Sequence, residues 1–319
     1  MPDNTSRVIT NTFTQKFKEK TSSKNVLYVG PENVTDQYQW MFSNFRNLTE
    51  NLHFIDVENN TSDFGKYDLI VGDLPFGTMR KKVATDKLGA IKVETSWVYI
   101  WSIMKDIKKD GYGIFSVSPS IWYSHGGRFM KWIMEKHNIH LNAVIDPPQG
   151  ILQPYTSLHP NIVLFSKNSS ESLFIAKNDD INGVDIIIEN LINKVSTDNI
   201  SKGMLVEQTE FKGFENFYFK KQIENLQSGY KGFKDYKLID VAKEIYPGKS
   251  DKAFNKKQNA IYLPNIGLSK VQYDLNELTL KSQNYFQIVL DSSIVINKYA
   301  ASFYNSSLGK AIRNTLLRG

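Results

Sequence analysis

The chain has 319 residues, of which 41% are hydrophobic and 23% are charged, a composition typical of globular proteins and not of disordered chains. It contains no cysteine, which excludes disulfides and thiolate metal sites within it. The length allows two domains of ordinary size.

The net charge of +6 is unevenly distributed. Residues 1–230 hold 25 Lys and Arg against 26 Asp and Glu, whereas residues 231–319 hold 14 against 7. The basic end indicates either a polyanionic partner or a solvated lysine-rich surface, and charge alone leaves both open.

The pattern of apolar residues predicts strands that alternate with helices over the first half of the chain. Strands are expected at 26–29, 52–57, 68–71, 113–117, 143–145 and 161–165. Helical spacing is found at 35–45, 94–109 and 128–136. This alternation favours an α/β fold with a parallel, doubly wound sheet.

The same pattern predicts four segments. Residues 1–23 form a polar lead-in, in which Phe13 and Phe17 allow a short helical stripe, and 24–168 form the sheet domain. Residues 169–235 form a linker with a connector helix over 211–230. Residues 236–319 carry short strands, turn signals and lysine clusters, and form a smaller α+β domain that is possibly incomplete.

Neither a secretory signal nor an apolar run of about 20 residues is visible, so we expect a cytoplasmic protein with no membrane segment. The five histidines do not have the spacing of metal ligands, and no metal site is expected.

Residues 66–77 are the most informative stretch of the chain. A short apolar strand leads into the turn Asp73-Leu74-Pro75-Phe76. Open α/β sheets bind their ligands at the carboxyl ends of the strands, where such a turn lies. It supplies a hydrogen-bond acceptor, a stiff backbone and a flat apolar ring, which together suit a planar base that carries an amino group.

This turn is close to the [Asp/Asn/Ser]-Pro-Pro-[Tyr/Phe/Trp] signature of amino-group methyltransferases that act on nucleic acids. Further motifs follow it in order, at 94–109, 110–119, 124–128, 144–157 and 160–167. The succession resembles the N6-adenine DNA methylase domain of modification subunits in type I restriction systems, over residues 25–167. The resemblance implies a Rossmann-like sheet that uses S-adenosylmethionine as methyl donor.

The resemblance also implies roles for the four residues of the turn. Asp73 would accept a hydrogen bond from the adenine N6 amino group, and the carbonyl of Leu74 would accept a second. Phe76 would stack on a base flipped out of the duplex. Leu74 stands where the family has proline, which removes some rigidity from the turn before Pro75.

The expected donor site departs further from the family pattern. Gly30 ends the first strand and Asp56 ends the second, where it would bind ribose hydroxyls, and both are implied donor-binding residues. Tyr28 stands where the family has an acid, and Glu32 stands where it has a second glycine. A glycine there lets the donor approach the backbone, whereas a side chain crowds it.

Two other features have ordinary structural interpretations. Asp146-Pro147-Pro148-Gln149 matches part of the signature but lacks its aromatic residue, so it is not the preferred site. Trp97, Trp101 and Trp132 are expected to belong to the core and not to stack on bases.

The basic end resembles the opening of a target-recognition domain from a type I specificity subunit. The segments that carry this resemblance are 236–245, 248–250, 260–267, 284–291, 299–305 and 308–310. It implies double-stranded DNA as a partner, and the lysines expected to contact phosphates are Lys249, Lys252, Lys256 and Lys257. Asn265 or Gln258 would face base edges.

The sequence thus predicts a DNA adenine-N6 methyltransferase of a restriction-modification system, with other subunits of that system as possible partners. The alternative is a catalytically degenerate methylase-fold subunit that serves DNA binding or complex assembly. A generic nucleotide-binding enzyme is less favoured, because the dinucleotide-binding Gly-x-Gly-x-x-Gly is missing.

Overall fold

The computed structural model describes residues 5–30, 44–47, 66–72, 74, 81–85, 89–104, 106–118, 131–132, 134–135, 138–150, 159–230, 232, 235–266 and 269–316. The chain divides into two compact units, Met1–Lys212 and Gly213–Gly319. The expected helix 128–136 and strand 52–57 lie wholly or mostly outside the described residues.

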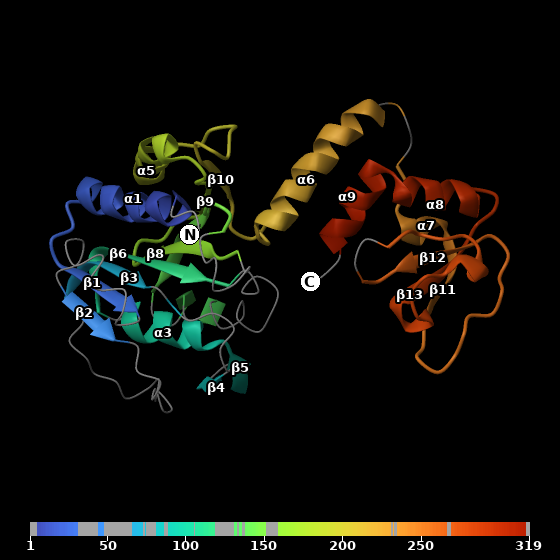
Figure 1. The fold of residues 1–319 in the computed structure, drawn as a ribbon, viewed down its shortest axis with the longest axis horizontal. Coiled ribbons are helices and arrows are strands. Elements are labelled where there is room, and N and C mark those ends of the chain that lie inside the picture. The colour runs from blue at the N-terminus through green and yellow to red at the C-terminus, as the bar shows by residue number, and fades with distance from the viewer. Residues whose placement is uncertain are drawn as a thin grey trace. The chain divides into compact units, whose positions relative to one another are not determined.

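The first unit is an α/β unit (Figure 1). Its helices within the described residues are α1 (Thr5–Lys20), α3 (Thr95–Met104) and α5 (Val184–Asn193), and a 3₁₀ turn, Ile181–Gly183, precedes α5. Its strands are β1 (Val26–Gly30), β2 (Asn44–Asn47), β3 (Tyr67–Gly72), β4 (Lys81–Thr85), β5 (Gly89–Val93), β6 (Ile107–Val117), β7 (His140–Asp146), β8 (Asn161–Ser166), β9 (Ser172–Lys177) and β10 (Met204–Glu207).

Eight of these strands form one sheet in the order β10-β9-β7-β8-β6-β3-β1-β2. The strands β2, β1, β3 and β6 are parallel, and β7 and β9 run the same way. The strands β8 and β10 are reversed. The mixed, mostly parallel sheet confirms the expected α/β, Rossmann-like fold class, although the two reversed strands were not predicted.

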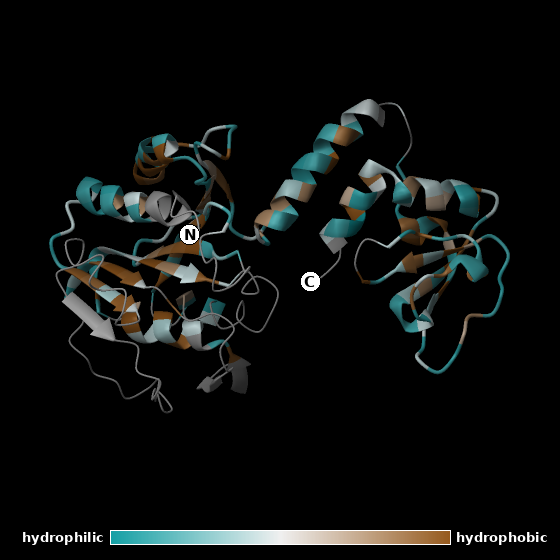
Figure 2. Ribbon diagram, in the orientation of Figure 1, coloured by the Kyte–Doolittle hydropathy of each residue, from teal (hydrophilic) through white to brown (hydrophobic). Residues whose placement is uncertain are grey.

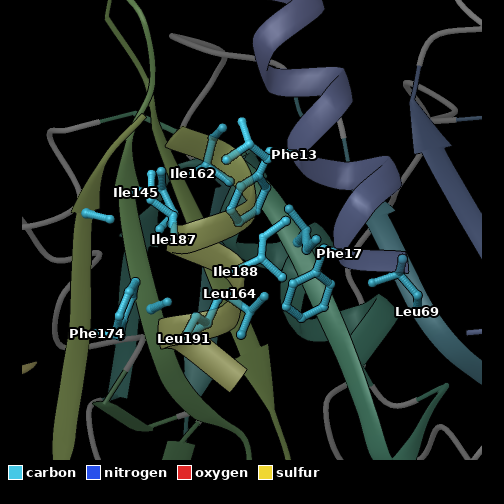
Figure 3. Close-up of a cluster of buried hydrophobic side chains, with 14 of the residues drawn as sticks. Phe13, Phe17, Leu69, Ile145, Ile162, Leu164, Phe174, Ile187, Ile188 and Leu191 are labelled. Carbon is cyan, nitrogen blue, oxygen red and sulfur yellow. The ribbon is translucent and has the colours of Figure 1, made fainter. Parts of the chain in front are cut away.

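Helices cover both faces of the sheet, with α1 and α5 on one side and α3 on the other (Figure 1). On the first side, Phe13 and Phe17 of α1 and Ile188 of α5 point toward the strands and pack against Ile162 and Leu164 (Figure 3). Hydropathy follows this arrangement, because the strands are brown and the outer surface of α1 is teal (Figure 2).

The N-terminal segment is a correction to the sequence analysis. Residues 5–20, expected to belong to a polar lead-in, form a regular helix. Phe13 and Phe17 are each only 1% exposed, so α1 is an integral layer of the first unit. Ion pairs from Lys16 to Asp185 and from Lys20 to Glu189 join α1 to α5.

Two element boundaries also differ from the prediction. The helix expected at 94–109 ends at Met104, and β6 already begins at Ile107. The helix expected at 35–45 is described only at its end, where residues 44–47 are the strand β2. Trp97, Trp101 and Trp132 are between 1% and 4% exposed, which confirms them as core residues.

The second unit is a small α+β unit. Its helices are α6 (Phe214–Gln227), α7 (Leu238–Val241), α8 (Asn297–Asn305) and α9 (Ser307–Leu316), its 3₁₀ turns are Ser228–Tyr230, Leu275–Glu277 and Ser282–Asn284, and its strands are β11 (Ala242–Pro247), β12 (Ala260–Pro264) and β13 (Tyr285–Leu290). The strands form an antiparallel sheet in the order β11-β13-β12. Ala300 and Ala301 of α8 pack on Ile261 and Ile288 of this sheet.

The expected linker is therefore shared between the two units. Its first part contributes β9, α5 and β10 to the first unit. The expected connector helix is α6, which belongs to the second unit and packs against α9. None of the helices in the described part of the chain combines the length and the apolar character that crossing a bilayer requires.

Candidate functional site

The site expected from the sequence lies at the carboxyl edge of the large sheet, where β1 and β3 are parallel neighbours. Val29 pairs with Gly72, so the ends of the two strands lie level with each other. Gly30 ends β1, and Gly72 immediately precedes Asp73 in the sequence. The fold thus brings Gly30, the glycine expected to bind the donor, next to the strand that leads into the expected catalytic turn.

Only one residue of that turn belongs to the described part of the chain. Leu74 is buried, with 2% of its surface exposed, so its side chain belongs to the interior. Asp73, Pro75 and Phe76 lie outside the described residues, as does Asp56 of the donor site.

Gly72 is required by packing, which the sequence analysis did not notice. A Cβ on Gly72 would lie 2.4 Å from Cδ1 of Phe115 on the neighbouring strand β6. Phe115 is fully buried, so it has little room to move away. The absence of a side chain at Gly72 therefore lets β3 run close to the Phe115 ring just before the expected catalytic turn.

The space over Gly30, where the donor is expected, is filled by a side chain of the same strand. A Cβ on Gly30 would lie 2.6 Å from the Oη atom of Tyr28 and 2.8 Å from its Cζ atom. Tyr28 is 4% exposed. The phenol ring thus takes the space that the missing side chain of Gly30 leaves open.

Buried polar residues gather farther along the same edge, around the end of β7. The Oδ1 atom of Asp146 lies 2.7 Å from Nε2 of His159, and its carbonyl accepts a hydrogen bond from the amide of Asn178. The side chains of Asp146 and Asn178 are buried. Within the part of the chain that the structure describes, neither the side-chain amide of Asn178 nor Nδ1 of His159 has a hydrogen-bond partner.

Asp146 was expected from the sequence only as part of a second match to the signature, with no link to His159. The signal was present, because the two residues stand at the two ends of the connection between two predicted strands. Among the described residues, no three His, Asp or Glu side chains converge in a way that could hold a metal ion.

The four lysines expected to bind DNA are all exposed on the second unit. Lys257 has an acidic neighbour, because its Nζ atom lies 3.4 Å from Oε2 of Glu244 and 5.4 Å from the ring centre of Tyr246. Hydrogen bonding to Glu244 raises the pKa of Lys257, and the hydroxyl of Tyr246 and the Lys257 ammonium lower that of Glu244.

The remaining DNA-binding candidates differ from Lys257. Within the described part of the chain, Lys249, Lys252 and Lys256 form no ion pair. Asn265 and Gln258 are exposed, and Nδ2 of Asn265 donates to the carbonyl of Gln283. The structure therefore brings three unpaired positive charges and Gln258 to the surface of one loop-rich stretch.

Searches of protein-family models and of curated proteins found no match to the chain. Solved structures do resemble it. One is the modification subunit of a candidate type I restriction enzyme from Vibrio vulnificus YJ016, at 17% identity and a TM-score of 0.40, covering 52% of this chain and 38% of that chain.

A second is the type I restriction-modification methyltransferase subunit from Streptococcus thermophilus, at 11% identity and a TM-score of 0.44, covering 63% of this chain and 54% of that chain. A third is the type IIG restriction endonuclease BpuSI, at 10% identity and a TM-score of 0.44, covering 78% of this chain and 36% of that chain. The chain thus spans less than two thirds of each of these proteins, and identities this low leave its function to be argued from its own residues.

Proposed function

We propose that this chain is a methyltransferase-like protein of a restriction-modification system that acts on the N6 amino group of adenine in DNA. One observation carries the proposal. The strand β3, which leads into Asp73-Leu74-Pro75-Phe76, lies beside β1 with Gly72 level with Val29. The proposed base-binding turn follows Gly72 in the sequence and the proposed donor-binding Gly30 follows Val29, so both begin at the edge where open α/β folds bind ligands.

The proposed roles concern the base and belong to residues of the chain. Asp73 accepts a hydrogen bond from the adenine N6 amino group, and the main-chain carbonyl of Leu74 accepts another. Both bonds hold the nitrogen in place for attack. Phe76 stacks on the flipped base and offsets part of the unstacking cost, which is a few kcal/mol.

The methyl donor implied by the family resemblance is S-adenosylmethionine, for which Gly30 and Asp56 are the proposed binding residues. Tyr28 occupies the space over Gly30, so a donor bound there would require the ring to turn away. The contribution of the chain is to bind and orient the base.

The second unit is the proposed DNA-binding module, with double-stranded DNA as partner. Exposed Lys249, Lys252 and Lys256 supply contacts to phosphates, which give affinity that does not depend on sequence. The other subunits of a restriction-modification system are proposed as further partners.

The experiment is a methyl-transfer assay on the full chain, with duplex DNA and millimolar S-adenosylmethionine, in which N6-methyladenine is measured by mass spectrometry. We expect methylated adenine with the unchanged chain and a loss of at least about 100-fold in Asp73→Ala, since misplacing the reacting amine costs that much. Methylation that Asp73→Ala leaves intact would contradict the proposed turn.

A second candidate function is supported by the position of Tyr28 over Gly30. It is a catalytically degenerate methylase-fold subunit that serves DNA binding or complex assembly. This candidate predicts no methyl transfer under the same conditions and a DNA affinity that Asp73→Ala leaves unchanged, whereas it still falls with salt.

A further inference from the structure

Tyr28 lies directly on Gly30, and strand geometry explains why. Residues two apart on a strand face the same side of the sheet, so the Tyr28 ring leans along β1 over the next position on that side. The site that a Cβ on Gly30 would take is 2.6, 2.8 and 3.0 Å from Oη, Cζ and Cε1 of Tyr28. A methyl-sized group on Gly30 and the ring therefore cannot occupy this space together.

The backbone of β1 cannot move away to make room. β1 is paired on both sides, with Tyr28 opposite Phe45 of β2 and opposite Val71 of β3. Every residue of β1 is buried. The space over Gly30 can thus be opened only by rotating the Tyr28 side chain into another rotamer.

We propose that Tyr28 closes the donor site of this chain, so that S-adenosylmethionine is excluded from the position over Gly30 while the ring lies there. This inference rests on the proposed function, which supplies the identity of the donor. A glycine at the end of the first strand normally allows a ligand to approach the backbone. Here the Tyr28 side chain, two residues earlier, fills the space through which a ligand would approach the backbone of Gly30.

The test measures donor binding and does not depend on catalysis. S-adenosylhomocysteine, the demethylated form of the donor, is titrated calorimetrically into the full chain, Tyr28→Ala and Tyr28→Phe. Tyr28→Ala removes the ring, and its affinity is expected to exceed that of the unchanged chain by at least about tenfold. Tyr28→Phe keeps the ring and is expected to bind as weakly as the unchanged chain.

A folding control is needed because Tyr28 is buried and its truncation leaves a cavity. Tyr28→Leu keeps an apolar body on β1 without the phenol, and it carries the test if circular dichroism shows Tyr28→Ala to be unfolded. The inference is overturned if the unchanged chain and the folded variant bind S-adenosylhomocysteine equally tightly, or if neither of them binds it.

The same protein preparations separate this inference from the proposed function. An unchanged chain that binds the donor tightly and methylates adenine overturns the closure and supports the proposed function. A chain that binds neither duplex DNA nor the donor, with Tyr28→Ala equally inert, overturns both. Donor binding gained by Tyr28→Ala without any DNA affinity supports the closure alone.

Discussion

The Oδ1 atom of Asp146, the last residue of β7, lies 2.7 Å from Nε2 of His159, two residues before β8. The Asp146 side chain is 6% exposed and that of His159 is 24% exposed, so the contact is largely shielded from water. It joins the two ends of the connection between β7 and β8 at the carboxyl edge of the sheet. Asp146 therefore has a hydrogen-bond partner within the fold.

Replacing Asp146 by alanine is expected to destabilise the first unit. The change removes the hydrogen bond between Asp146 and Nε2 of His159. Among the described residues, Nδ1 of His159 has no partner either, so both nitrogens of this partly buried ring would then lack one there. Loss of one partner of a buried polar pair lowers the free energy of unfolding by about 1–3 kcal/mol. Unfolding in urea measures this difference.

The matched control is His140→Ala, because Nε2 of His140 bonds Oδ1 of Asn138 at the exposed surface. We expect His140→Ala to change the free energy of unfolding by less than about 0.5 kcal/mol. A double-mutant cycle of Asp146→Ala and His159→Ala isolates the pair. A coupling energy near zero would show that the contact contributes nothing to stability.

The strands of the first unit were predictable because their apolar runs are local signals. The runs at 26–29, 68–71, 143–145 and 161–165 all lie within observed strands. The direction of β8 was not predictable, since it depends on which strands it pairs with across the sheet. Helix α1 was expected only as a short stripe within a polar lead-in, because the buried Phe13 and Phe17 are one turn apart in a polar context.

The candidate site was predictable only in part. The motif locates Asp73 after a strand, and the observed β3 supports that location. The sequence also shows that Tyr28 replaces an acid, but not that its ring turns onto Gly30. That position follows from the side chain's rotamer and from the close pairing of β1 with both neighbours, which no local pattern encodes.

Asp68 of β3 is expected to stabilise the first unit in a pH-dependent way. Its carboxylate accepts hydrogen bonds from the amides of Lys24 and Asn25 and from Nζ of Lys108. Partial burial alone would raise the pKa of Asp68, but the Asn25 amide, the Lys108 ammonium and the Lys24 amide together lower it below 3.8.

Because the pKa is lower in the folded state, the stabilisation is present above the unfolded pKa and is lost as the pH falls through the folded value. Asp68→Asn is therefore expected to cost about 1–2 kcal/mol at pH 7. The difference in the free energy of unfolding between Asp68→Asn and the unchanged chain should become smaller below a pH of about 4. Unfolding in urea at several pH values measures it, and the exposed Asp110→Asn is the control. A difference in unfolding free energy that stays constant down to pH 2 would contradict the stabilising role of the Asp68 carboxylate.

Three exposed lysines of the second unit are expected to contribute to DNA binding through phosphates. The combined variant Lys249, Lys252 and Lys256 to Gln should weaken binding and flatten its salt dependence, by about 0.9 in the slope of log K against log salt for each lost contact. Fluorescence anisotropy with a duplex at several salt concentrations measures both. Lys257→Gln should have a smaller effect, because Lys257 is already paired with Glu244.

The control for net charge is a triple variant of three exposed lysines in the first unit, Lys194, Lys202 and Lys212 to Gln. It removes the same charge from another surface. If both triple variants lower the slope equally, the effect comes from overall charge, and the stretch around Lys249 has no special role in DNA binding.

Gly248, directly after β11, is expected not to tolerate a side chain. Its amide donates to the carbonyl of Tyr285 at 2.9 Å. A Cβ on Gly248 would lie 1.7 Å from the carbonyl oxygen of Ser282 and 2.9 Å from that of Tyr285. Both neighbours are backbone atoms, so no side-chain rotation can relieve the overlap, and the end of β11 must move away from β13.

Gly248→Ala should therefore lower the free energy of unfolding by about 1–3 kcal/mol, the range found for overpacked interiors. Hydrogen exchange at the amides of β13 measures the local effect, because the pairing of β11 with β13 is what the shift disrupts. Gly229→Ala is the matched control, since a Cβ there has no neighbour within 4 Å. Exchange on β13 that is as slow in Gly248→Ala as in Gly229→Ala would mean that the turn after β11 absorbs the extra methyl group without strain on the sheet.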